Sequence, residues 1–265
     1  MILEEIAEAT RKRVQEHKEK MPFTEVRKLA ERMDDNGSFP FKEALKRDGM
    51  SFICEVKKAS PSKGLIAEDF PYLDIAREYE EAGAAAISCL TETDYFLGSD
   101  EYLIEIAENV SIPVLRKDFT VDEYMIFEAK TLGASAVLLI CTLLEREKLK
   151  YFLEIAHSIG LSALVETHDE KEMENALYSG ADIIGVNNRN LKDFTVDIDN
   201  SIRLRRLVPE DKIFVAESGI KNADDVTRLY ENDCSAVLIG ESLMRSNNKR
   251  ETLAELRSGC MTKGG

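Results

Sequence analysis

The sequence predicts a (β/α)8 TIM barrel, in which eight parallel strands alternate with eight helices, preceded by an N-terminal helical extension. The first observation is a recurring sequence pattern in which an amphipathic helical segment ends at a small residue and an apolar run follows. The pattern occurs at Gly83, Gly133, Gly180 and Asp233, at intervals of about 50 residues, the length of two strand–helix units. Glycine suits this place because it readily adopts the left-handed conformation that ends a helix.

The second observation is a set of eight apolar runs separated by amphipathic segments. Strands are expected at residues 51–57, 85–91, 112–118, 135–141, 161–167, 182–187, 212–217 and 235–240. Helices are expected at residues 74–82, 101–109, 123–132, 145–159, 170–179, 199–207, 223–231 and 249–257. Continuous apolar runs are typical of strands covered on both faces, and strict alternation indicates a parallel sheet. An open doubly wound sheet is the alternative, weakened because no Gly-x-Gly-x-x-Gly motif follows the first run.

The first 50 residues are interpreted as an extension that packs on the barrel. An apolar stripe on an otherwise charged helix consists of Ile2, Leu3, Ile6 and Ala9. A loop is expected at 34–38 and a short helix at 41–47. The whole chain is therefore predicted to be one domain, with the barrel at 51–258 and a disordered tail at 259–265.

Composition excludes some classes of partner. The net charge of −15 argues against binding to nucleic acid or to an anionic membrane, both of which need a basic surface. The longest apolar stretch, 134–144, is too short to span a bilayer, and the N-terminus lacks the pattern of a signal peptide. Five cysteines without CxxC spacing indicate a reduced, cytoplasmic protein. The three histidines are scattered, so no histidine metal site is expected.

The first strand and the loop after it form the most informative segment. Because side chains alternate along a strand, Glu55 and Lys57 share one face, whereas Cys54 and Val56 lie on the other. Burying a carboxylate and an ammonium is costly unless they are paired or used. The polar loop at 60–65 is expected to be a mobile lid, with Lys63 reaching inward.

Polar residues also end the other strands, and in a barrel these ends meet at one mouth, where catalysis takes place. Those singled out are Glu55, Lys57, Lys117, Glu166, Asn187, Arg189, Glu217, Ser218, Gly219 and Gly240. Any one of them alone is equally explained as a structural ion pair or a turn residue. Together, two carboxylates and two lysines indicate acid–base chemistry, and glycine turns after the last two strands indicate phosphate binding.

At these residues the chain resembles the indole-3-glycerol-phosphate synthase family over nearly its whole length. The matching motifs are EVKKASPSKG (55–64), LRKDF (115–119), LVE (164–166), GVNNR (185–189), AESGI (216–220) and LIG (238–240). The resemblance implies a lyase of tryptophan biosynthesis that closes a ring with decarboxylation and dehydration. The implied substrate is 1-(2-carboxyphenylamino)-1-deoxyribulose 5-phosphate, and no metal or organic cofactor is implied. The expected partner is thus a phosphorylated small molecule, and the chain is expected to be a monomer, with a homodimer as the alternative.

The resemblance also implies roles for individual residues. It places catalysis at Lys117, Glu166, Lys57 and Glu55. It places substrate binding at Ser60, Phe119, Asn187 and Arg189, and phosphate binding at Ser218, Gly219, Gly240 and Glu241. Lys117 is implied to protonate the ketone oxygen, and Glu166 to serve the dehydration as base or acid. Which lysine protonates in each step is left open.

The chain departs from the family pattern at Thr167 and Asn190, neither of which is given a role. Glu241 stands where the family varies; since a carboxylate repels phosphate, its side chain is expected to turn away. Two other functions are considered. A phosphoribosylanthranilate isomerase-like enzyme would want a cysteine or carboxylate ending the first strand, but Cys54 has the wrong parity. A phosphate-binding barrel without catalysis would have lost part of the acid–base set.

Overall fold

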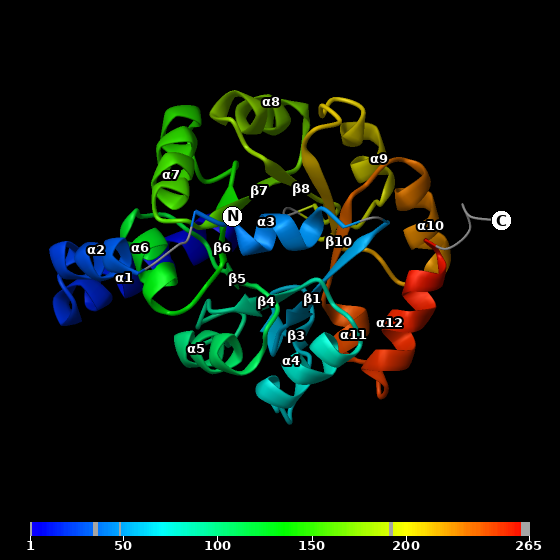
Figure 1. Cartoon of the computed structure of the whole chain (residues 1–265), viewed down its shortest axis with the longest axis horizontal. Coiled ribbons are helices and arrows are strands. Elements are labelled where there is room, and N and C mark those ends of the chain that lie inside the picture. The colour runs from blue at the N-terminus through cyan, green and yellow to red at the C-terminus, as the bar shows by residue number, and fades with distance from the viewer. Residues whose placement is uncertain (1, 34–36, 48, 191–192, 261–265) are drawn as a thin grey trace.

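The computed structural model describes residues 2–33, 37–47, 49–190 and 193–260, and these contain a closed barrel of parallel strands (Figure 1). Around the barrel the strands follow the order β1-β10-β9-β8-β7-β6-β5-β4. Their bounds are β1 Ser51–Val56, β4 Ala86–Leu90, β5 Val114–Lys117, β6 Ala136–Ile140, β7 Ser162–Thr167, β8 Ile183–Asn187, β9 Ile213–Glu217 and β10 Ala236–Ile239. The predicted fold class is confirmed, and the open doubly wound sheet is excluded because β1 pairs with both β4 and β10.

A helix follows each barrel strand, within a few residues of the predicted bounds. These helices are α4 Tyr72–Glu81, α5 Asp100–Asn109, α6 Tyr124–Thr131, α7 Arg146–Ser158, α8 Glu170–Ser179, α9 Asp199–Arg205, α10 Ala223–Glu231 and α12 Lys249–Ser258. Side-chain oxygens of Ser99, Asp169, Asn222 and Asn248 accept hydrogen bonds from the first turn of the helix that each precedes. The four residues at which the recurring pattern ends a helix all have positive φ, from 58° at Asp233 to 88° at Gly133. This is the left-handed backbone conformation expected just after the last turn of an α-helix.

Two layers of apolar side chains build the core. The inner layer fills the barrel with residues such as Ile53, Leu115 and Leu164, and the outer layer packs the strands against the helices. Cys54 and Val56 belong to the outer layer, so the predicted parity of β1 is confirmed. The same parity directs Glu55 and Lys57 toward the barrel axis.

The N-terminal extension consists of α1 Ile2–Lys20, α2 Phe23–Arg32 and α3 Pro40–Leu45. Helix α2 packs beside α6, while α3 crosses the barrel opening nearest the viewer in Figure 1. Phe41 and Leu45 of α3 join the inner layer and close the amino ends of the strands. The extension is therefore part of the barrel's core.

Three short elements were not predicted: the antiparallel pair β2 Ala59–Ser60 and β3 Gly64–Leu65, and helix α11 Glu241–Met244. At the carboxyl end, Gly259 and Cys260 still donate backbone hydrogen bonds to the last turn of α12. The remainder of the predicted tail, 261–265, and residues 34–36 of the predicted loop lie outside the described residues. Within the described ranges, every helix falls short of a membrane span in length, in apolarity or in both.

Candidate active site

A cavity of about 490 Å³ opens at the carboxyl ends of the strands. Its lining includes every site residue predicted from the sequence: Glu55, Lys57, Ser60, Lys117, Phe119, Glu166, Asn187, Arg189, Ser218, Gly219, Gly240 and Glu241. Ile2, Leu3 and Ile6 of α1 also line it, so the predicted apolar stripe forms part of the wall. The residues predicted for the site therefore line one cavity at this mouth.

Lys117 lies at the end of β5 and is mostly buried, with its side chain 14% exposed. Its Nζ lies 3.5 Å from Oε2 of Glu166 and 3.5 Å from Oε2 of Glu217. Burial disfavours the ammonium, but the charges of Glu166, Glu217 and Glu55 outweigh it and raise the pKa of Lys117. The lysine is therefore a charged proton donor held between two carboxyl groups.

The two carboxyl groups beside Lys117 have opposite pKa shifts. For Glu166, burial favours the neutral form, but Lys117, His168 and a hydrogen bond from Asn187 outweigh it and lower the pKa. For Glu217, burial together with the charges of Glu166 and Glu55 outweighs Lys117 and raises the pKa to about 8. The opposite shifts favour the ionised form at Glu166 and the protonated form at Glu217.

Glu217 is a site residue to which the sequence reasoning gave no role. It lies on the inner face of β9 with Ile213 and Val215, and it is buried. Gly185 of β8 makes room for it, since a Cβ at residue 185 would collide with the Glu217 carboxyl group. The alternation along β9 was a usable signal, because it points a carboxyl group into the barrel.

At the end of β1 the Lys57 ammonium forms an ion pair with Oε1 of Glu55. Glu55 is buried and Lys57 is 15% exposed. Gly240, after β10, makes room for this pair, because a Cβ there would collide with the Glu55 carboxylate and approach Lys57 Nζ to 2.9 Å. The absence of a side chain at Gly240 thus leaves room for the Glu55–Lys57 ion pair, in addition to the phosphate-binding role predicted for this glycine.

The loops after β9 and β10 form the other side of the mouth. Ser218 and Gly219 both have left-handed backbone conformations, with φ of 65° and 86°. Two successive residues of this kind turn the backbone sharply at the cavity. A Cβ at Gly219 would lie 2.5 Å from Val196, so this turn requires glycine for space as well as for φ.

The expectation for Glu241 is wrong: its side chain faces the cavity mouth. Its carboxylate lies 3.4 Å from Lys63 Nζ, 3.9 Å from Arg189 and 3.4 Å from Arg245. The cations that would attract a phosphate also attract this carboxylate, which explains its orientation. Lys63 of the loop after β1 does reach inward, as predicted.

The mouth differs in charge from the whole chain, which carries −15. Its basic lining residues are Lys57, Lys63, Lys117, Arg189, Lys221 and Arg245, and its acidic ones are Glu55, Asp118, Glu166, Glu217 and Glu241. The basic residues outnumber the acidic ones, and the raised pKa of Glu217 widens the difference. This balance suits an anionic ligand in a cavity with low-dielectric walls.

One wall of the cavity is apolar and aromatic. The rings of Phe96 and Phe119 lie 5.9 Å apart in a tilted arrangement, and both residues line the cavity. Pro61 and Ile6 add apolar surface. A flat aromatic group fits such a wall.

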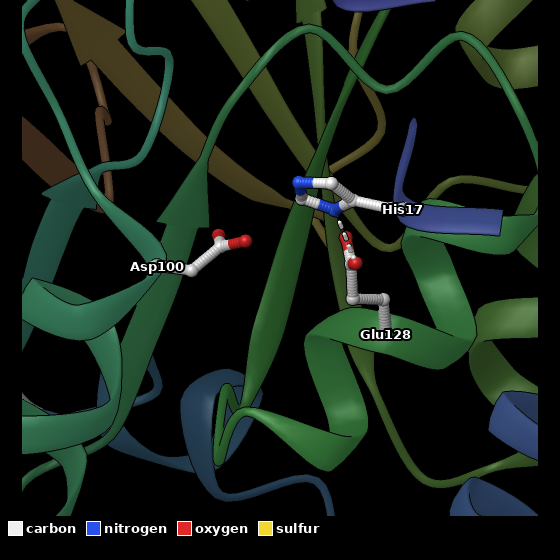
Figure 2. A group of neighbouring side chains, drawn as sticks. All are labelled: His17, Asp100 and Glu128. Carbon is white, nitrogen blue, oxygen red and sulfur yellow. Dashed lines mark hydrogen bonds and ion pairs between the residues drawn. The ribbon is translucent and has the colours of Figure 1, made fainter. Parts of the chain in front are cut away.

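A second polar cluster lies outside the barrel, where His17 of α1 contacts Glu128 of α6 near Asp100 of α5 (Figure 2). His17 Nδ1 lies 2.6 Å from Glu128 Oε1, and the possible ligand atoms of the three residues lie within 4.8 Å of one another. The buried Arg116 guanidinium already pairs with Asp100 and with Glu128, each at 2.9 Å. Because an arginine cannot be deprotonated, it supplies the positive charge here, and the cluster is an ion network between helices.

Comparison with known proteins matches residues 3–256 to the family described as indole-3-glycerol phosphate synthase. The chain is 56% identical over 260 residues to the indole-3-glycerol phosphate synthase of Ruminiclostridium cellulolyticum, covering 98% of this chain and 100% of the relative. It is 56% identical over 257 residues to that of Endomicrobium trichonymphae, covering 97% and 100%. Among solved structures, a 3-hexulose-6-phosphate synthase superposes with a TM-score of 0.63 at 13% identity, covering 79% of this chain and 99% of that one. The last similarity shows the fold alone.

Proposed function

The chain belongs to the indole-3-glycerol phosphate synthase family, and we propose that it catalyses the reaction of that name in tryptophan biosynthesis. The substrate is 1-(2-carboxyphenylamino)-1-deoxyribulose 5-phosphate, and the products are indole-3-glycerol phosphate, carbon dioxide and water. The observation that carries the proposal is Lys117, a buried ammonium held between two carboxyl groups in the cavity. The reaction needs a proton donor there, because the substrate loses a carboxylate as carbon dioxide and therefore consumes a proton.

In the first step the ring carbon that bears the carboxylate attacks the ketone carbon, and negative charge develops on the ketone oxygen. Lys117 donates a proton to that oxygen. Its ammonium is already desolvated and fixed by Glu166 and Glu217, so it needs little reorganisation as the charge develops. Loss of carbon dioxide then restores the aromatic ring.

In the second step water is lost, and Glu166 serves this step as its proton-transfer group. Its low pKa keeps it ionised, which suits a base that removes a proton as the hydroxyl group leaves. Lys57 either holds the substrate carboxylate or protonates the departing hydroxyl group. Glu55 orients Lys57 through their ion pair.

Binding is divided between the two sides of the mouth. Phe119 and Ser60 receive the anthranilate ring, and Asn187 supports both Glu166 and Arg189: its amide lies 3.4 Å from Glu166 Oε1, and its Oδ1 accepts the Arg189 backbone N–H. The phosphate is held on the opposite side. Backbone groups of Ser218, Gly219, Gly240 and Glu241 bind it, together with Lys63 and Arg189.

The two other functions are less well supported. Cys54 packs among helix-facing side chains, and burial raises its pKa to about 12, so it cannot serve as the acid or base of an isomerase. A barrel without catalysis does not explain why Lys117, Glu166 and Glu217 share one buried site. We further infer a cytoplasmic protein, since the five cysteines are free thiols. The monomer expected from the sequence stays a prediction.

The test is an assay of the purified protein with the carboxyphenylamino-deoxyribulose phosphate, following indole fluorescence. The chain has no tryptophan, so its own signal is low. Formation of indole-3-glycerol phosphate with release of carbon dioxide supports the proposal. An isomerised product that keeps its carboxylate would instead support the isomerase, and binding without turnover would support the non-catalytic barrel.

A further inference from the structure

Glu166 and Glu217 compete for one lysine. Each places its Oε2 at 3.5 Å from Lys117 Nζ, and each is buried. Two carboxyl groups that share one small buried site do not both ionise readily, because like charges repel strongly there. The distance to Lys117 is the same for both, although the lysine also donates a hydrogen bond to Glu166, so distance alone does not decide which of them carries the charge.

The two carboxyl groups differ in their second oxygen. Oε1 of Glu166 lies 3.4 Å from Nε2 of His168 and 3.4 Å from the Asn187 amide. Oε1 of Glu217 is buried and has no hydrogen-bond partner among the described residues. Part of the asymmetry of the site therefore lies on the far side of Glu166 from Lys117, and the charge of Glu55, which raises the pKa of Glu217, adds to it.

His168 is held in place by residues outside the cavity. Its Nδ1 lies 3.0 Å from Oε2 of Glu172 on α8, which also accepts the His168 backbone N–H at 2.8 Å. The other oxygen of Glu172 accepts a hydrogen bond from Thr142 at 2.6 Å. Because Glu172 is fixed at both oxygens, it fixes the imidazole ring. Nε2 lies 3.4 Å from Glu166 Oε1, an ion-pair distance, and has no hydrogen-bond partner among the described residues.

We propose that His168 is a positioning residue that selects Glu166, rather than Glu217, as the ionised carboxylate of the site. Its imidazolium lies between Glu166 and Glu172 and stabilises negative charge on Glu166. The role of Glu166 as the proton-transfer group rests on the proposed function above. His168 itself lies outside the cavity lining and acts through Glu166.

The charges that face His168 come from several elements. Glu166 on β7 and Glu172 on α8 are in contact with it, and Glu217 on β9 and Lys117 on β5 lie behind Glu166. Burial disfavours the imidazolium, but the hydrogen bond to Glu172 and the charges of Glu166 and Glu172 outweigh it and raise the pKa of His168. The ring is thus charged over a wider pH range than an ordinary histidine.

The first test is the pH profile of kcat/KM for His168→Gln. Without the imidazolium the pKa of Glu166 rises, so the acidic limb should move to higher pH by about one unit, with about tenfold loss on that limb. The matched control is Glu174→Gln, an exposed glutamate on α8, the helix that carries Glu172, and its profile should match wild type. A His168→Gln profile that is lowered evenly, with its acidic limb unmoved, overturns the proposal.

The second test is rescue. If Glu217 takes the charge when His168 is absent, then removing Glu217 should return it to Glu166. The double variant His168→Gln/Glu217→Gln should therefore have its acidic limb moved back toward the wild-type pH. A double variant whose acidic limb stays where His168→Gln puts it contradicts competition between the two carboxyl groups.

The third test does not depend on turnover. The chain has three histidines, so their NMR titrations are resolvable, and His168→Gln identifies the signal of His168. Glu166→Gln and Glu172→Gln should each lower the pKa of His168, whereas Glu174→Gln should leave it unchanged. If the pKa of His168 does not change in Glu166→Gln, the proposed coupling between His168 and Glu166 is wrong. Wild-type protein that does not convert the substrate refutes only the proposed function, and the titration still decides the coupling.

Discussion

Arg13 of α1 donates hydrogen bonds to both carboxylate oxygens of Asp118, at 2.8 and 2.6 Å, and Asp118 directly follows Lys117. The pair connects the N-terminal extension to the strand end that carries the proposed proton donor. Two further contacts lie nearby on the same helix: Lys18 pairs with Asp122 at 2.8 Å, and His17 with Glu128. Helix α1 is therefore fixed to the segment from β5 to α6 by several ionic contacts.

The first prediction concerns this connection. Arg13→Ala should lower the free energy of unfolding by about 3 kcal/mol, because it leaves the buried Asp118 carboxylate without its main partner. Chemical denaturation measures the change. The control is Arg11→Ala on the same helix, whose exposed pair with Glu8 should contribute less than about 1 kcal/mol. Equal losses in the two variants would contradict a special role for Arg13.

The same pair has a pH dependence with a definite sign. Burial alone would raise the pKa of Asp118, but Arg13, Arg116 and Thr91 outweigh it and lower the pKa below its ordinary 3.8. A depressed carboxyl pKa stabilises the fold above the unfolded value, and this stabilisation is lost as pH falls through the folded value. The difference between wild type and Arg13→Ala should therefore shrink as the pH falls below about 3.8.

Most of the fold could be predicted because its signals are local. Buried apolar runs, helix caps and the residues at the four helix ends lie in the sequence itself, and the strand bounds agree with the structure to within a few residues. The β2–β3 pair and α11 were missed because they are very short and depend on the loops around them. Helix α2 was not delimited, since its stabilising contact with α6 is distant in sequence.

The sequence predicts which residues belong to the candidate site, but it does not predict which of them contact one another. Strand parity places Lys117 and Glu166 at the mouth, yet it does not show that Glu217 lies as close to the lysine as Glu166 does. His168 lies between a strand and a helix, and nothing in the sequence distinguishes it from other residues in such loops. Its contacts with Glu172 and Glu166 appear only in the structure. The orientation of Glu241 depends on where three cations lie in the closed barrel.

A second prediction separates chemistry from binding. Lys117→Ala should lower kcat by roughly 10²–10⁴-fold, the usual contribution of a placed acid, and Glu166→Gln should lower kcat similarly with KM within a few-fold. Ser218→Ala should mainly raise KM, since a phosphate that does not react is bound equally in ground and transition states. Steady-state kinetics decide it. If Lys117→Ala keeps a near-normal kcat and Ser218→Ala has no turnover, the catalytic end and the phosphate-binding end of the site have been assigned the wrong way round.

A third prediction concerns the loop after β1. Lys63→Ala should raise KM by a few-fold to about tenfold, because its ammonium reaches the mouth and would contact the phosphate, although its partial exposure weakens the effect. The increase should diminish at high salt. Lys28→Ala, on an exposed site of α2, is the control and should change neither constant. If kcat and KM are both unchanged in Lys63→Ala, Lys63 does not contribute to substrate binding.

The orientation of Glu241 leads to a fourth prediction. Its carboxylate pairs with Lys63 and Arg189, so phosphate must compete with it for both cations. Glu241→Gln should therefore lower KM by a few-fold, with kcat little changed, since it removes a repulsive charge from the binding side. Kinetics at low and moderate salt should show the larger gain at low salt. A higher KM would mean that Glu241 supports the phosphate site by holding the two cations in place.

A fifth prediction concerns the thiols. Cys54, Cys89, Cys141 and Cys234 are buried, and burial raises the pKa of each, whereas Cys260 is partly exposed. A thiol reagent that needs the thiolate should therefore react with one cysteine per native chain and with all five in strong denaturant. The pKa of Cys260 is also raised by its partial burial, so even this reaction should be slower than that of a free thiol. Cys260→Ser should abolish the native reaction while leaving the other four reactive after unfolding. A native Cys260→Ser protein that still reacts rapidly would show that the helix-facing layer around β1, β4, β6 or β10 opens more readily than its packing implies.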